Sequence, residues 1–439
     1  MRKPLKWGVA AGAALAMLGA FAGCSTGSST GGTPSASSSI GSGGYDGPAV
    51  QITFWNGWTG GNAPTLVPQM INQFNSTHPN ITVKDVPQQW ADINSKMPLA
   101  IQSGNGPDVA VLHGDDLGTY AAQHLLLDAG SLITTLGYSS ADFPPGVFDK
   151  GNYKGVQYAI PWSVTPLGLY VNTDVAAKAN ITTVPTNKTD YEADLNALKG
   201  AGVQGEWVDS FVFTGTYQFE SLLWQFGGDL YNSDVTQATF NSDAGVQALQ
   251  WMLDHINNGW SPANVSQDGN FNAIVSGDAA YNWNGVWQTT NTSLSGVKWQ
   301  AAPVPQIGSQ QAVWSSSTHW VFPANKGQDP NKTAAAATFV KWMNDNAAGW
   351  ASTGELPAAN TVRNDPSLAQ QYPNLVPFIN ELPYAHYETV APGIGDANAL
   401  ITTAISNALT GKMSPQDALN DAANQADQVL QQNQAKYGG

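Results

Sequence analysis

Hydrophobic residues along the folded part of the chain alternate between short runs of strand length and longer stretches with helical spacing. Strand-like apolar runs lie at 51–55, 81–83 and 108–112. Between them, apolar residues recur on one helical face at 66–74 and 93–101. This strand–helix–strand–helix–strand order predicts a mostly parallel sheet covered by helices.

The same alternation continues toward the C-terminus. Strand-like runs lie at 158–161 and 167–172, and helical spacing recurs at 246–256, 334–343 and 415–430. The sequence therefore predicts an α/β protein. With 439 residues, the chain is too long for one ordinary core, so two lobes are expected.

The N-terminus has the pattern of an exported protein. Basic residues within the first six positions precede an apolar run at 7–21, and a small-small-Cys ending follows at Cys24, the only cysteine of the chain. This pattern predicts a signal peptide at 1–23 and resembles a bacterial lipobox, in which Cys24 is acylated. The alternative is an ordinary signal peptide followed by a coincidental cysteine. Ser, Gly and Thr dominate the residues that follow, so 24–49 is expected to be a flexible tether.

Charge narrows the range of partners. The chain has 17 basic and 32 acidic residues, a net charge of -15. Such a surface repels phosphate backbones, which argues against nucleic acid as a partner. Beyond the signal peptide, the sequence has no second hydrophobic run long enough to span a membrane.

Four further segments, found in order along the chain, resemble those of a known family. They are SGNGPDV at 103–109, the stretch 158–174, the stretch 276–287 and GKMSPQDAL at 411–419. Together they resemble the carbohydrate-binding, maltose-binding-protein-like class of extracellular solute-binding proteins that serve ABC importers. The resemblance runs from about residue 51 to residue 431.

The resemblance implies a two-lobed periplasmic-binding-protein-like fold with a hinge and a ligand cleft between the lobes. It divides the chain into a first lobe of 50–162 with 306–350 and a second lobe of 166–302 with 357–439. The connections between the lobes are then expected at 163–165, 303–305 and 354–357.

Aromatic residues are the first candidates for ligand contact, because a sugar ring presents an apolar C–H face that stacks on flat side chains. Trp58 lies in the loop after the first strand, where ligands of such sheets bind. Trp287 resembles the stacking tryptophan of the family, and Tyr217 matches a family aromatic. Packing in a core is the alternative for each of them.

Polar side chains are needed at the edge of a sugar. The candidates are Thr59, Asp115, Asp116, Thr165, Ser317 and Asn398. Asp115 and Asp116 match two sugar-contacting positions of the maltose-binding relative, although Asp116 stands where that relative has Arg. The alternative for both is capping the helix that follows them.

The sequence thus predicts a binding protein, not an enzyme, that captures a mono- or oligosaccharide and delivers it to permease subunits with their ATPase. The protein is expected to be a monomer, held on the extracellular face of the membrane through Cys24, without cofactor or metal. One alternative is another cargo, such as a polyamine. Another is a secreted glycoside hydrolase, which needs two carboxylates roughly 5 Å or 6.5–9.5 Å apart. Acids for such a pair exist at Glu220, Glu355, Glu381 and Glu388, but no sequence pattern pairs them.

Overall fold

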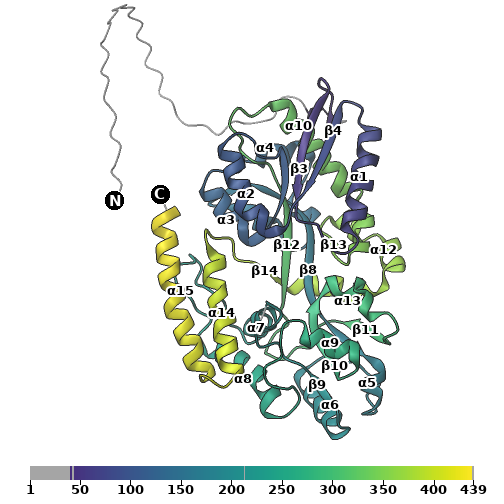
Figure 1. The fold of residues 1–439 in the computed structure, drawn as a ribbon, viewed down its shortest axis with the longest axis vertical. Coiled ribbons are helices and arrows are strands. Elements are labelled where there is room, and N and C mark those ends of the chain that lie inside the picture. Colours follow the sequence, from purple (N-terminus) through teal and green to yellow (C-terminus); the bar gives the residue numbers. More distant parts are fainter. Residues whose placement is uncertain (1–39, 42–43, 212, 438–439) are drawn as a thin grey trace, which may run out of the picture. The chain divides into compact units, whose positions relative to one another are not determined.

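One sheet runs through the part of the chain that the structure describes, which in this computed structural model is 40–41, 44–211 and 213–437 (Figure 1). The sheet has ten strands, with the order β4-β3-β5-β12-β8-β10-β9 and with β11 and β13 beside β8 and β14 beside β12. The predicted signal peptide and Cys24 lie outside the described residues.

The first lobe has the predicted parallel strands. They are β3 (Val50–Asn56), β4 (Ile81–Pro87) and β5 (Val109–His113), and β3 pairs in parallel with both others. The helices of this lobe are α1 (Ala63–Thr77), α2 (Trp90–Gln102), α3 (Gly114–Ala122), α4 (Gly130–Leu136) and α10 (Pro330–Asp345). Apolar faces such as Val67, Met70, Ile71 and Phe74 of α1 are buried against the sheet, as the helical spacing predicts.

The second lobe is richer in helix. Its strands are β9 (Gln204–Glu206), β10 (Ala279–Gly285) and β11 (Trp299–Ala302). Its main helices are α5 (Thr173–Ala177), α6 (Lys188–Gly200), α7 (Phe213–Gln225), α8 (Asp243–Asn257), α9 (Gly269–Ser276), α14 (Ile394–Leu409) and α15 (Pro415–Tyr437). Helix α14 packs on α15, α7 and α8, so the C-terminal helices belong to this lobe.

Shorter strands and α-helices lie before and between these elements. They are β1 (Ile40–Gly41), β2 (Gly44–Tyr45), β6 (Asn152–Tyr153), β7 (Val156–Gln157), β13 (Leu356–Pro357), β14 (Ala385–Tyr387), α11 (Asn360–Arg363), α12 (Pro366–Gln371) and α13 (Val376–Glu381). None of the helices in the described ranges is long and apolar enough to cross a membrane.

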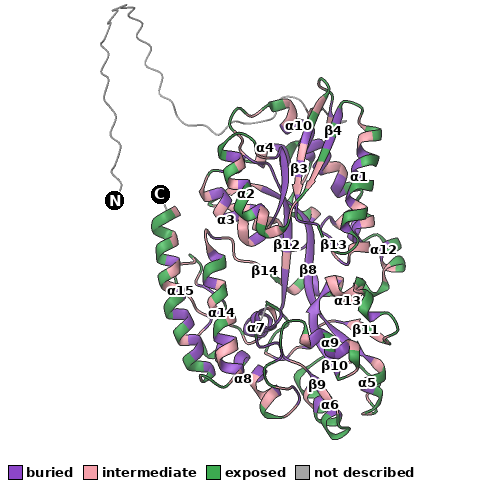
Figure 2. Cartoon of the chain, in the orientation of Figure 1, coloured by how far each residue is buried: buried purple, intermediate pink, exposed green. Residues whose placement is uncertain are grey.

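Two long antiparallel strands connect the lobes. Strand β8 (Ala159–Asn172) pairs with β12 (Val313–Val321) in its first half and with β10 in its second half. All residues of β8 are buried, and Figure 2 shows both strands as a buried band through the centre of the sheet. A strand covered on both faces needs the near-continuous apolar run that the sequence has here.

The second connection lies later in the chain than the predicted 303–305. The Ile307 backbone N–H donates to Gln225 Oε1 at 2.6 Å, and the Trp314 N–H donates to Ser221 Oγ at 2.9 Å. Both acceptors belong to α7, so the residues up to Trp314 remain on the second lobe. The chain then passes to the first lobe inside β12, where a continuous strand leaves no proline or glycine signal.

Packing also begins earlier than the tether prediction allowed. Tyr45 is buried, its backbone N–H donates to Thr338 Oγ1 of α10 at 2.9 Å, and its hydroxyl donates to the Pro48 carbonyl at 2.7 Å. A single buried aromatic next to a Ser/Gly-rich stretch carries no periodicity, so the sequence pattern did not reveal it.

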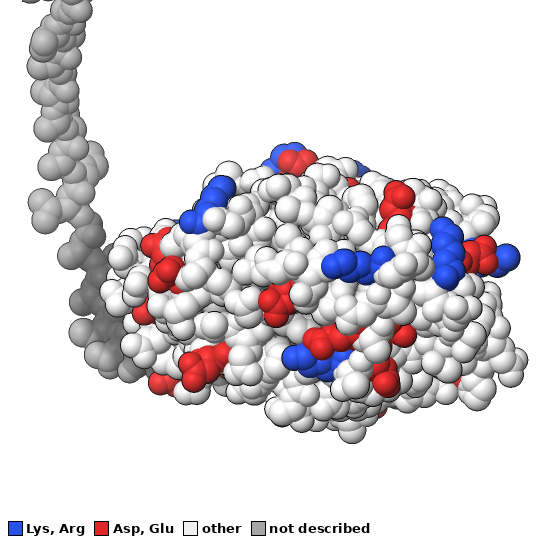
Figure 3. All heavy atoms as spheres, turned by 90° about the horizontal axis from the view of Figure 1, so that it is seen from below, with Lys and Arg blue, Asp and Glu red and all other residues white. Residues whose placement is uncertain are grey.

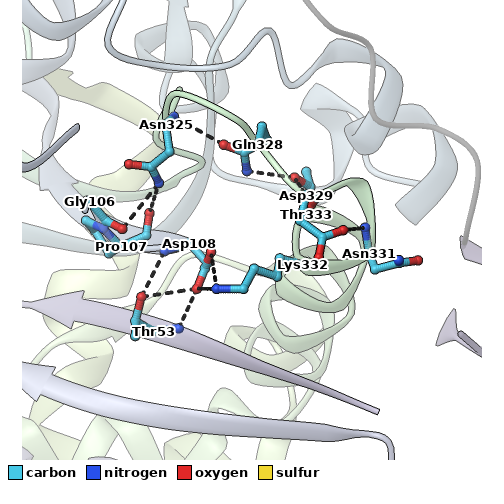
Figure 4. A network of polar contacts seen from close by, with 10 residues as sticks. All are labelled: Thr53, Gly106, Pro107, Asp108, Asn325, Gln328, Asp329, Asn331, Lys332 and Thr333. Atoms are coloured by element: carbon cyan, nitrogen blue, oxygen red, sulfur yellow. Dashed lines mark hydrogen bonds and ion pairs between the residues drawn. The ribbon is translucent and has the colours of Figure 1, made fainter. Parts of the chain in front are cut away.

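A polar network surrounds Asp108, the residue just before β5, and links it to β3 and α10 (Figure 4). Asp108 Oδ2 accepts from the Thr53 N–H at 2.8 Å and from the Thr53 hydroxyl at 3.1 Å, and Lys332 of α10 lies 3.2 Å away. Asn325 Nδ2 also donates to the Pro107 carbonyl at 2.8 Å. The Gly-Pro-Asp motif at 106–108 therefore connects strand β3 with helix α10.

Charged residues are sparse over the surface in Figure 3, where they stand singly or in small groups among uncharged side chains. This agrees with a charged content of only 11%, well below the ~25% of an average soluble domain.

Candidate functional site

A cavity of about 670 Å³ is lined by residues of both lobes and of the connecting strands. It lies beyond the carboxyl end of β5, where ligands of such sheets bind. Seven of its lining residues are aromatic: Trp90, Phe213, Tyr217, Trp224, Trp287, Trp314 and Tyr387. Five are carboxylic acids: Asp115, Asp116, Glu220, Glu355 and Glu388.

The structure brings six of the nine predicted ligand contacts together around this cavity. They are Asp115, Asp116, Thr165, Tyr217, Trp287 and Asn398. They come from α3, β8, α7, the turn after β10 and α14, segments far apart in the sequence.

The two residues predicted from the first loop do not line this cavity. Trp58 is only 5% exposed and packs in the first-lobe core, with its ring centroid 4.5 Å from that of Trp350 and 5.6 Å from that of Trp162. Thr59 is exposed and its hydroxyl donates to Gln89 Oε1 at 3.3 Å. For Trp58 the loop position is as expected, but the side chain turns toward the core.

Ser317 lies behind the cavity wall and contacts a residue that lines it. Its backbone N–H donates to Glu388 Oε1 at 2.9 Å, and its hydroxyl lies 3.1 Å from Glu388 Oε2 and 2.9 Å from His319 Nε2. Ser317 and His319 are fully buried. Ser317 therefore orients the Glu388 carboxylate at the cavity surface, and His319 holds the Ser317 hydroxyl.

The second lobe contributes a continuous aromatic wall. Tyr217 and Trp314 stack with their ring centroids 3.5 Å apart, and the Trp287 ring stands at 89° to Trp314 with centroids 6.5 Å apart. Phe213 packs 5.6 Å from Tyr217. Gly285 makes room for this wall, because a Cβ there would lie 1.8 Å from the Trp287 ring.

The first lobe faces the cavity with a smaller aromatic pair. The rings of Trp90 and His113 lie 4.2 Å apart, at the start of α2 and the end of β5. Sequence reasoning missed Trp90. Its position directly after the second strand was a usable signal, since the loops following parallel strands meet at one edge of the sheet.

Asp115 and Asp116 occupy the first turn of α3 and do not cap it, because the N-cap position is His113 and no side chain accepts a capping bond there. Asn94 Nδ2 donates to both oxygens of Asp116 at 3.2 Å. Burial, and then the charge of Asp115, raises the pKa of Asp116 to about 7.

Three of the four glutamates noted as possible hydrolase acids line the cavity. Burial, and then the charges of Glu388 and Asp115, raises the pKa of Glu220 to about 8. Burial and Asp115 likewise raise the pKa of Glu388 to about 7. Glu355 accepts from Ser163 Oγ at 2.9 Å and from Trp350 Nε1 at 3.0 Å. No sequence spacing linked these acids, because they converge only through the fold.

The fourth glutamate, Glu381, does not line the cavity. Glu381 is fully buried away from this cavity and accepts from the Val304 N–H at 2.6 Å. Among the residues with described positions, no group of three or more His, Cys, Asp or Glu is arranged to hold a metal ion.

The sequence of this chain is similar to those of known solute-binding proteins. The family model for bacterial extracellular solute-binding proteins matches residues 57–350. The maltodextrin-binding protein MdxE of Bacillus subtilis (strain 168) is 25% identical over 369 residues, which are 79% of this chain and 82% of the relative. The galactooligosaccharide-binding protein of the same organism is 21% identical over 387 residues, covering 84% and 87%.

A solved structure gives the same picture for the fold. The cyclic alpha-maltosyl-1,6-maltose binding protein from Arthrobacter globiformis superposes with a TM-score of 0.78 at 23% identity, covering 88% of this chain and all of its own. The α/β architecture with two lobes is thus confirmed.

Proposed function

The chain belongs to the family of bacterial extracellular solute-binding proteins, and from this premise we propose that it captures a sugar outside the cell and delivers it to an ABC importer. The cargo is a mono- or oligosaccharide. The protein acts as a binding protein and not as an enzyme, in keeping with relatives that are named for the carbohydrates they bind.

The observation that carries the proposal is the aromatic wall opposite hydrogen-bonding groups in one cavity. Tyr217 and Trp287 offer flat surfaces for the C–H faces of a sugar ring, while Asp115, Thr165 and Asn398 offer acceptors and donors for its hydroxyls. The volume of about 670 Å³ falls within the usual range for small-molecule sites.

Sugar binding is coupled to closure of the two lobes because residues of both lobes line the cavity. A sugar that contacts Asp116 on one side and Trp287 on the other gains contacts only when the lobes are close, so binding raises the population of the closed state. The closed protein then docks on the permease subunits, and their ATPase drives import.

The proposed function includes a lipid anchor at Cys24. An acyl chain on Cys24 holds the monomeric protein at the extracellular face of the membrane. Radiolabelled palmitate incorporated by the wild-type protein and lost in Cys24→Ser supports the anchor. Equal labelling of both proteins contradicts it.

A second cargo class, a polyamine, is favoured by one observation, namely that five carboxylates line the cavity. Intrinsic tryptophan fluorescence and calorimetry with neutral oligosaccharides, amino sugars and spermidine separate the two. A saturable response to a sugar supports the proposal, whereas a response to spermidine alone overturns it.

A further inference from the structure

We propose that the sugar bound by this cavity carries a protonated amine, so that the cargo belongs to the amino sugars. This inference rests on the proposed function, because it specifies the chemical class of the ligand at the same site.

The first observation is the imbalance of charge in the lining. Five carboxylic acids line the cavity, and its described lining contains no lysine or arginine. His113 is the only basic side chain there, and burial lowers its pKa. Lys150, whose charge acts on Glu388, lines a neighbouring cavity instead. The lining itself therefore supplies only acidic side chains and a histidine, and Lys150 acts on Glu388 from the neighbouring cavity.

The second observation is that one buried polar side chain of the lining has no partner. Glu220 is 5% exposed and receives no hydrogen bond or ion pair from the described residues, although Asp116 and Glu388, which line the same cavity, have donors. Buried polar groups are nearly always satisfied in native proteins. Glu220 is therefore placed for a ligand that donates hydrogen bonds and brings positive charge.

Sugar hydroxyls alone do not resolve this arrangement. Hydroxyls donate to carboxylates but leave their charges unbalanced, and the charges of Asp115 and Glu388 already raise the pKa of Glu220. Burying such a group beneath a neutral ring keeps it protonated. An ammonium group has three donors and a full positive charge, which stabilises the ionised carboxylates.

The aromatic wall suits the same ligand. Tyr217 and Trp287 line the cavity together with Glu220. An aromatic face attracts a cation within about 6 Å of the ring centroid. A charged amino sugar can therefore stack its ring on the wall while its amine meets the carboxylates.

The test compares two sugars of one length whose nitrogens are either free, charged amines or neutral acetamides. Purified protein is titrated by calorimetry with glucosamine oligosaccharides of one length, either fully N-acetylated or fully de-N-acetylated, with maltodextrin and spermidine as further arms. The amine form is expected to bind at least tenfold more tightly than the acetylated form. Its affinity is expected to rise at least threefold from pH 5.5 to 6.5 with release of protons, because binding ionises the carboxyl groups.

A pair of variants localises the effect. Glu220→Gln keeps the shape of the side chain and removes its charge, so it is expected to weaken binding of the amine form at least tenfold. Asp345→Asn, an exposed site on α10 paired with Lys341, serves as the matched control and leaves affinity unchanged. Should Glu220→Gln fail to fold, the charge comparison and its pH dependence in the wild-type protein still decide the matter.

The outcomes separate this inference from the proposed function. Equal or tighter binding of the acetylated form, or binding of maltodextrin alone, overturns the amino-sugar assignment and leaves sugar capture standing. Binding of spermidine without any sugar overturns both, as does a lack of binding by every member of the panel.

Discussion

Tyr217 and Trp314 stack almost face to face, with ring centroids 3.5 Å apart and planes 10° apart. Tyr217 belongs to α7 of the second lobe, and Trp314 belongs to β12, the strand that continues into the first lobe. The Trp314 backbone N–H also donates to Ser221 Oγ, one turn along α7. The cavity wall is therefore attached to the strand that connects the lobes.

This stack makes the ring of Tyr217 more important than its hydroxyl. Tyr217→Phe keeps the stacking surface, so sugar affinity is expected to stay within about threefold of the wild type. Tyr217→Ala removes the ring, and the expected loss is roughly 1–3 kcal/mol of binding free energy. Calorimetry with the cognate sugar measures both. A loss of affinity in Tyr217→Phe as large as that in Tyr217→Ala would show that the hydroxyl, not the ring, contacts the ligand.

Two tryptophans separate binding from stability. Trp287 is half-buried at the cavity, and Trp58 is 5% exposed in the first-lobe core. Trp287→Ala is expected to weaken sugar binding by roughly 1–3 kcal/mol with little change in the melting temperature. Trp58→Ala is expected to reduce the free energy of unfolding by about 3–5 kcal/mol through the cavity it leaves.

Paired calorimetry and urea denaturation check this assignment, each variant serving as the control for the other. If Trp58→Ala lowers affinity and leaves stability intact, Trp58 contacts the ligand after all and its buried position here does not represent the bound state.

Local sequence patterns predicted much of the fold and some of the cavity. The period of the apolar residues located β3, β4, β5 and their helices. Asp115 and Asp116 were expected at the cavity from their position just after β5, and they line it from the first turn of α3. The same reasoning expected Trp58 to line the cavity, but its side chain packs in the core. A loop position says where a backbone lies, whereas the direction of a side chain depends on the packing around it.

Other site residues could not be found from the sequence because they meet only in three dimensions. Glu220, Glu355 and Glu388 come from α7, the residue before β13 and the residue after β14. No spacing joins three such positions. The passage of the chain through β12 was missed for a related reason, since a continuous strand has no breaker where it leaves one lobe for the other.

Stability is expected to fall as pH rises from 6.5 to 8. The pKa values of Asp116 and Glu388 are raised to about 7 and that of Glu220 to about 8, mainly by burial. The folded state holds these protons more tightly than the unfolded chain, so their stabilising contribution is lost as pH passes through the folded values. Each unit rise in pH lowers the free energy of unfolding by about 1.4 kcal/mol for every group that is protonated only in the folded state. Thermal unfolding across this range measures the effect.

Below pH 6.5 an opposing effect sets in. Burial lowers the pKa of His319 to about 3 and also lowers the pKa values of His113 and His386. These neutral imidazoles favour folding above pH 6.5 and disfavour it as pH falls. The interval from 6.5 to 8 therefore isolates the carboxyl groups. Glu220→Gln is expected to reduce the slope there, and an unchanged slope would contradict the assignment to Glu220.

The polar network before β5 gives a prediction about the first lobe alone. Asp108→Ala removes the acceptor of the Thr53 N–H and hydroxyl, so it is expected to cost about 1–3 kcal/mol of unfolding free energy. Lys332→Met removes only an ion pair whose lysine is 38% exposed, so its cost is expected to stay below about 1 kcal/mol.

Urea denaturation of the two variants shows which one loses more unfolding free energy. Sugar affinity is the internal control, because Asp108 lies at the opposite end of β5 from the cavity. Unchanged affinity with a larger loss for Asp108→Ala supports a purely structural role for the Gly-Pro-Asp motif. A larger loss for Lys332→Met would mean that the ion pair, not the bonds to Thr53, secures this end of the sheet.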